Sequence, residues 1–204
     1  MHKNVLTARS WLENAMEVKD EKIKLVAETG TQNILNAMSD KCKILLPSTH
    51  VVYEGITEVK NNILENDKVK PILSYANSKA INEEQLKKSG KNYIILRLGS
   101  VYGYSTDTAR IDIMPNLFSK IASQDGTLKL FAAGRQVKSL VPLIDVARCF
   151  KFMEERDDIS SELFNLTKET ITVKEVGEIC KKYNPKTTLK ETNDEIPNLG
   201  FSLS

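Results

Sequence analysis

The chain has 204 residues, of which 41% are hydrophobic and 27% are charged, as in an ordinary globular protein. Lysine and arginine exceed aspartate and glutamate by only two charges, so the sequence offers no strongly basic face for nucleic acid. The longest apolar runs hold about four to six residues, whereas a membrane span needs roughly 20. We therefore predict a protein that neither binds nucleic acid nor crosses a membrane.

The cysteines and histidines limit the chemistry further. Cys42, Cys149 and Cys180 lie far apart and form no C-x-x-C pair, which argues against zinc or redox chemistry. With His2 and His50 as the only histidines, Cys/His and Ser/His/Asp nucleophile systems lack parts. We expect reduced thiols, no metal site and a cytoplasmic location.

The first half of the chain alternates helical and strand patterns. Apolar residues recur at spacings of three and four over residues 20–39, which predicts a helix of about four turns. Residues 43–53 have the pattern of a short apolar strand with hydroxyl residues toward its end. A second helical pattern covers 75–88, and residues 91–98 predict a second buried strand that stops at Gly99.

The second half continues the alternation. We predict helices over 114–123, 144–155 and 173–183, and strands over 128–132 and 162–166. Strands that lie between helices favour a mostly parallel sheet covered by helices. The predicted fold class is therefore α/β.

One motif in this frame carries chemistry. Tyr75-Ala-Asn-Ser-Lys79 places a phenol and an ammonium one helical turn apart on the same face. A tyrosine pKa of about 10 is too high for a general base at neutral pH, but a fixed cation nearby favours the phenolate. Ser48 or Thr49, near the end of the preceding strand, would orient a substrate alcohol. The same spacing also occurs by chance on ordinary surface helices.

These residues belong to an ordered series of blocks that resembles the extended short-chain dehydrogenase/reductases, in particular the NAD-dependent nucleotide-sugar epimerases and dehydratases. The blocks are Thr29-Gly-Thr-Gln-Asn-Ile-Leu35, Pro47-Ser-Thr-His-Val-Val-Tyr53, Ser74-Tyr-Ala-Asn-Ser-Lys79 with Glu83, Arg97-Leu-Gly-Ser-Val-Tyr-Gly103 and Gly134 to Ala147. The resemblance implies that residues 1–104 are the later part of a Rossmann-like dinucleotide-binding domain. Residues 105–204 would then be part of a small C-terminal substrate-binding domain, with a strand and a helix that return to the sheet.

The resemblance also implies roles for single residues. Tyr75 would be the acid/base for a sugar hydroxyl, Lys79 would hold the nicotinamide ribose and lower the Tyr75 pKa, and Thr49 would share the substrate proton. The backbone near Leu98 and Gly99 would flank the nicotinamide of NAD or NADP. The substrate, a nucleotide-sugar, would meet Ser48, Ser100 and Lys138, with lysine where the family usually has arginine. The helices at about 20–39 and 75–88 would form a homodimer.

The main departure from the family is the phosphate site. No arrangement of the nine glycines gives G-x-x-G-x-x-G, and the first matching block already lies near residue 25. We therefore expect a truncated epimerase-like chain that is inactive in isolation. The alternative is a non-catalytic binding or assembly protein built on half of a Rossmann fold. The sequence names neither the sugar nor the nucleotide, and it does not decide between NAD and NADP.

Overall fold

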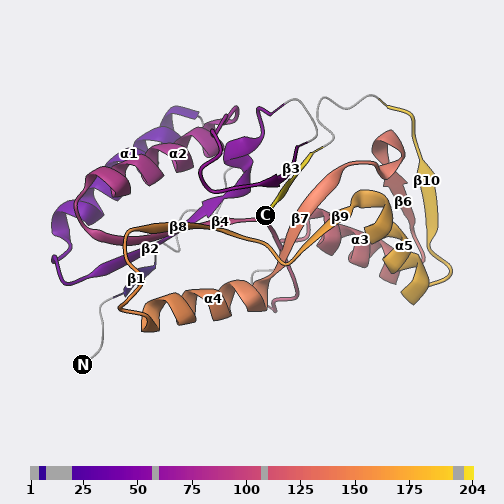
Figure 1. Cartoon of the computed structure of the whole chain (residues 1–204). Helices are drawn as coiled ribbons and strands as arrows, with labels where there is room; N and C mark the ends of the chain where they lie inside the picture. The colour runs from indigo at the N-terminus through magenta and orange to yellow at the C-terminus, as the bar shows by residue number, and fades with distance from the viewer. Residues whose placement is uncertain (1–4, 8–19, 57–59, 107–109, 195–199) are drawn as a thin grey trace. The chain divides into compact units, whose positions relative to one another are not determined.

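The computed structural model describes residues 5–7, 20–56, 60–106, 110–194 and 200–204, and it has an α/β, partial Rossmann-like fold (Figure 1). These residues group into two compact units. Unit 1 contains those within 1–55, 65–98 and 147–165, and unit 2 contains those within 56–64, 99–146 and 166–204. No helix among the described residues is long and apolar enough to span a membrane.

Unit 1 is built on a four-stranded sheet in the order β1-β2-β4-β8. Its strands are β1 (Val5–Thr7), β2 (Lys43–Thr49), β4 (Asn92–Leu98) and β8 (Glu162–Leu166). The β1–β2 and β2–β4 pairs are parallel, and Thr49 lies opposite Leu98. This register brings the carboxyl ends of β2 and β4 together, where α/β sheets bind ligands.

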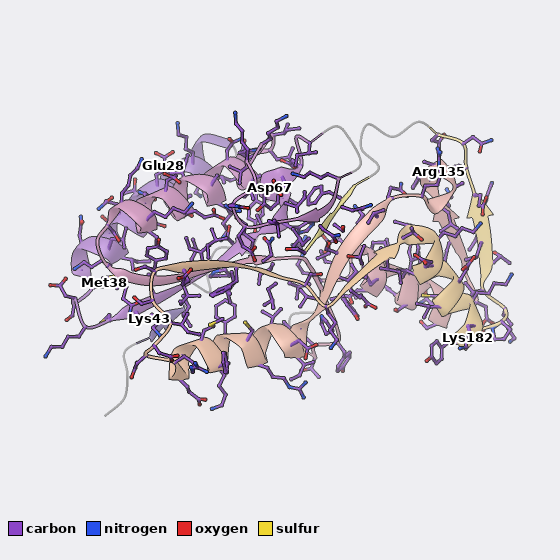
Figure 2. All side chains as sticks on the ribbon, in the orientation of Figure 1. Glu28, Met38, Lys43, Asp67, Arg135 and Lys182 are labelled. Atoms are coloured by element: carbon purple, nitrogen blue, oxygen red, sulfur yellow. The ribbon has the colours of Figure 1, made fainter. Side chains whose placement is uncertain are left out.

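Helices cover both faces of this sheet. Helices α1 (Asp20–Ala37) and α2 (Ser74–Lys88) pack side by side on one face, and α4 (Leu143–Glu155) covers the other face from Ala147 onward (Figure 1). The core between the sheet and the first pair of helices is apolar, and it consists of Leu35, Met38, Ile44, Leu46, Leu86 and Ile95. On the other face, the buried Lys43 of β2 (labelled in Figure 2) holds the end of α4, because its Nζ donates to the carbonyl oxygens of Met153 and Arg156.

Unit 2 contains three small sheets and two helices. The sheets are β5-β7-β9, β10-β6 and β11-β3, formed by β3 (Lys60–Ile63), β5 (Ser100–Tyr102), β6 (Thr127–Leu130), β7 (Val137–Pro142), β9 (Glu169–Thr172), β10 (Thr188–Glu191) and β11 (Phe201–Leu203). Helices α3 (Met114–Ser123) and α5 (Val173–Tyr183) share an apolar core with β6 and β7. The strand β11 is buried: Leu203 N donates to Ser139 Oγ, and Asn62 N donates to Ser202 Oγ.

Two predicted strands end earlier than expected. The strand predicted over 43–53 stops at Thr49, because the Thr49 hydroxyl accepts from Val51 N and starts a 3-10 turn, η2 (His50–Tyr53). The strand predicted over 128–132 stops at Leu130, because Ala132 and Ala133 take left-handed backbone conformations with φ of 47° and 53°. The α/β, mostly parallel architecture is confirmed.

Candidate active site

The carboxyl ends of β2 and β4 hold three of the predicted residues. Thr49 is the last residue of β2 and is largely buried, and Leu98 ends the neighbouring strand. His50 Nδ1 lies 2.9 Å from the Leu98 carbonyl oxygen, so this ring nitrogen carries the proton. Ser48 points elsewhere, because its hydroxyl donates to Glu83 Oε1 at 2.5 Å in the interior. Of Ser48 and Thr49, Thr49 is therefore the residue whose hydroxyl lies at the end of the strand.

Helix α2 carries the tyrosine and lysine to the same strand. This helix contacts β2 and η2, and Lys79 Nζ donates to the Pro47 carbonyl oxygen at 2.8 Å. The ammonium lies 5.9 Å from the centroid of the Tyr75 ring, and Tyr75 is half-buried. Lys79 is only 2% exposed, which excludes the ordinary surface helix as an explanation of this spacing. A buried cation beside a tyrosine ring is the arrangement that stabilises a phenolate.

A buried charged network lies on the inner side of this helix. Glu83 accepts from Arg97 Nη2 at 2.6 Å and from Nε at 3.0 Å, and both side chains are 3% exposed. Arg97 also donates to the Tyr53 hydroxyl and to the Glu65 carbonyl oxygen. Together with the Ser48 bond, these contacts join β2, η2, α2 and β4 in one cluster. Burial alone would lower the Arg97 pKa, but the hydrogen bonds and charge of Glu83 outweigh it and raise that pKa.

The pKa of Lys79 makes the stability of unit 1 depend on pH. Burial lowers it from 10.5 to about 8, and the charge of Glu83 only partly opposes this effect. Between these values the unfolded chain still holds the Lys79 proton while the folded chain has lost it, so the free energy of unfolding rises with pH. We expect wild type to gain about 3 kcal/mol relative to Lys79→Met between pH 7.5 and 10.5.

Denaturant unfolding of both proteins across this pH range measures the difference. Lysines and tyrosines elsewhere titrate equally in wild type and variant, so their contributions cancel in the comparison. Parallel stability curves for the two proteins would show that Lys79 is not a buried cation.

The remaining predicted residues lie in unit 2. Gly99 N donates to the Leu166 carbonyl oxygen at 2.9 Å, and a Cβ on Gly99 would lie 2.7 Å from the Ser139 oxygen, so the site demands glycine. Ser100 pairs with Leu140, and Lys138 precedes Leu140 by two residues on β7. Side chains alternate along a strand, so Ser100 and Lys138 share one face of this sheet. Lys138 is half-buried, and burial lowers its pKa.

Comparison with known proteins adds the family. Residues 13–167, more than half of the chain, match the NAD dependent epimerase/dehydratase family. The chain belongs to this family. The family match includes β2, α2 and β4 with the three residues Thr49, Tyr75 and Lys79. No curated protein matches the sequence.

Solved structures of this epimerase/dehydratase type share the fold. The match with a UDP-glucuronic acid 4-epimerase from Bacillus cereus covers 92% of this chain and 61% of that protein, with 21% identity and a TM-score of 0.75. A UDP-glucose 4-epimerase from Thermotoga maritima matches 91% and 62%, with 19% identity and a TM-score of 0.75. A dTDP-glucose 4,6-dehydratase from Bacillus anthracis matches 93% and 62%, with 18% identity and a TM-score of 0.76. The chain thus spans about three fifths of these proteins.

Part of this epimerase-family site escaped sequence reasoning. The pattern placed Glu83 and Arg97 in matching blocks, but it did not indicate that they form a buried ion pair with Tyr53 and Ser48 around them. One signal was available, because Glu83 follows Lys79 by four residues and therefore lies on the same helical face. A glutamate on an inward helix face requires a charged or hydrogen-bonding partner in the interior, which Arg97 supplies.

Proposed function

We propose that the chain is the part of an NAD-dependent nucleotide-sugar epimerase that binds the nicotinamide end of the cofactor and the substrate. The observation that supports this most strongly is the buried Lys79 ammonium beside the Tyr75 ring, held to the strand that ends in Thr49. Solved relatives with this fold were crystallised with NAD and with UDP-glucuronic acid or UDP-glucose. A nucleotide-sugar is accordingly the proposed substrate class.

In this proposal the three residues divide the proton chemistry. Tyr75 takes the proton of a sugar hydroxyl and later returns it, which is general base and then general acid catalysis. Lys79 favours the phenolate and holds the nicotinamide ribose, and Thr49 hydrogen-bonds the reacting oxygen. NAD, when bound, supplies the site that accepts and gives back a hydride. Ser100 and Lys138 are the proposed substrate contacts, with Lys138 as a point charge for phosphate. The predicted contact with Ser48 is not retained, because its hydroxyl donates to Glu83 in the interior.

The residues present fit one end of NAD better than the other. The buried cation and half-buried phenol suit the nicotinamide ribose, and Gly99 allows a close backbone approach after Leu98. A phosphate turn of the G-x-x-G-x-x-G type does not occur among the nine glycines of the sequence. Within these 204 residues the pyrophosphate therefore lacks the amide cradle that normally anchors it, and we propose that these residues alone are inactive.

The lack of a G-x-x-G-x-x-G turn in the sequence also favours a second function, that of a non-catalytic binding or assembly protein on half of a Rossmann fold. Titration of the chain with NADH, followed by nicotinamide fluorescence, distinguishes the two. A micromolar dissociation constant supports cofactor binding and would require a phosphate site of another kind, whereas a millimolar constant or no binding supports the second function. NADPH in a parallel titration tests which dinucleotide is preferred.

We also propose a homodimer in the cytoplasm. Helix α1 exposes Leu25 and Val26, which are 63% and 53% accessible, and the half-buried Ala80 and Ile81 line a shallow groove on α2. The exposed apolar side chains of α1 and the groove on the adjacent helix support pairing with a second copy. Cys42, Cys149 and Cys180 are free thiols, which supports a reducing compartment.

A further inference from the structure

The first turn of α2, which carries Tyr75, has no cap of its own. Its N-cap residue is Leu73, which has no side-chain acceptor, and its first turn contains no acidic residue. In α5, by contrast, Thr172 and Glu175 form a complete capping box. The start of α2 therefore needs contacts other than a side-chain cap from Leu73.

Glu54 supplies the glutamate half of such a box. Its Oε1 accepts from Leu73 N at 2.6 Å and from Ile72 N at 3.0 Å. This carboxylate does from outside the helix what the glutamate of a capping box does from within, and its charge suits the positive end of the helix. Asn77 completes the arrangement, because its Nδ2 donates to the carbonyl oxygens of the same two residues.

Apolar packing does not fix this dipeptide. The side chains of Ile72 and Leu73 are 65% and 60% exposed, so little apolar surface holds them in place. Their N–H groups bind Glu54 and their carbonyls bind Asn77, so polar contacts define where the helix starts. Tyr75 is the second residue after Leu73, so its position depends on where the helix starts.

Glu54 itself is tied to the strand that ends in Thr49. It follows the turn η2, in which Val52 and Tyr53 are fully buried and Thr49 Oγ1 accepts from Val51 N. The neighbouring backbone is also fixed, since Gly55 N donates to the Lys70 carbonyl oxygen and Lys70 N to that of Val52, both at 2.8 Å. One carboxylate thus links the rigid turn after Thr49 to the helix start before Tyr75.

We propose that Glu54 is a positioning residue that sets the Tyr75 phenol relative to Thr49 by anchoring the start of α2. The inference rests on the proposed function for the role of Tyr75, but the contact itself can be tested without turnover. Glu54→Ala removes the acceptor, Glu54→Gln keeps one acceptor oxygen without the charge, and Glu155→Ala is a matched control. Glu155 pairs with Lys151 on the exposed side of α4.

Amide hydrogen exchange and the ring ¹³C signal of Tyr75, both by NMR, are the two readouts. We expect Glu54→Ala to speed exchange at Ile72 and Leu73 on the order of fivefold and to move the Tyr75 signal toward that of an unstructured tyrosine. Glu54→Gln should recover most of both effects, and Glu155→Ala should show neither. Unchanged exchange in Glu54→Ala, or faster exchange with a fixed Tyr75 signal, would overturn the proposal.

The NADH titration keeps the two proposals apart. If Glu54→Ala moves Tyr75 in a chain that binds no NADH, the positioning role stands and the proposed enzymatic function fails. If wild type binds NADH but the Tyr75 signal does not change in Glu54→Ala, the positioning role fails and the proposed enzymatic function stands.

Discussion

Replacement of Glu83 by alanine is expected to destabilise unit 1 by about 3–5 kcal/mol. The variant leaves the Arg97 guanidinium, itself 3% exposed, in the interior without its carboxylate partner. It also removes the acceptor of the Ser48 hydroxyl. The loss therefore exceeds the value of the ion pair, because it includes the cost of a buried unpaired charge.

The neighbouring residue gives a matched control for this prediction. Glu84 is 55% exposed and pairs with Lys87 and Lys88 at the surface, so Glu84→Ala should cost less than about 1 kcal/mol. Urea unfolding at pH 7 measures both variants. The double variant Glu83→Gln with Arg97→Met should lose less than the sum of its single changes, because no charge is then left unpaired. Equal midpoints for Glu83→Ala and Glu84→Ala would contradict a buried pair.

If the NADH titration shows that the chain binds the cofactor, Tyr75→Phe is expected to have the largest effect on turnover. Loss of the phenol oxygen removes the proposed acid/base, a group worth about 100- to 10,000-fold in rate. The ring and its packing beside Lys79 remain, so the free energy of unfolding and the dissociation constant for NADH should change little. Turnover of UDP-glucuronic acid with NAD, a substrate bound by one solved relative, is the assay.

Tyr183→Phe is the control for Tyr75→Phe, because Tyr183 is 84% exposed at the end of α5. It removes the same atom from a surface position and should leave turnover unchanged. An active Tyr75→Phe protein would reject Tyr75 as the base. A wild-type chain that neither binds NADH nor turns over the sugar would support the assembly function.

The helices and buried strands could be predicted because each contains a strong local pattern. The bounds of α3, β8 and α5 coincide with the predicted ranges 114–123, 162–166 and 173–183. The pairing of β11 with β3 and of β10 with β6 could not be predicted, since these strands have three or four residues and their partners are distant in sequence. Short strands carry too few alternations to show which face is buried.

The candidate site was predictable in its helical part and in the strand-end hydroxyl of Thr49. Four-residue spacing placed Tyr75 and Lys79 on one face, and the structure brings them together. The strand end was misplaced because Val51, Val52 and Tyr53 have strand propensity, whereas the Thr49 side chain starts a turn there. The contact of Glu54 with Leu73 joins residues 19 apart through a loop, and no local periodicity encodes it.

The buried strand β11 has a consequence for how unit 2 is made during protein synthesis. The Ser202 hydroxyl meets Asn62 N across 140 residues of sequence, and Phe201 and Leu203 are buried in the assembled unit. Ribosomes add residues in order, so β3 remains without its partner until Leu203 has been synthesised. The pairing of β11 with β3 therefore forms late, and closing so long a loop makes this pairing a slow step of folding.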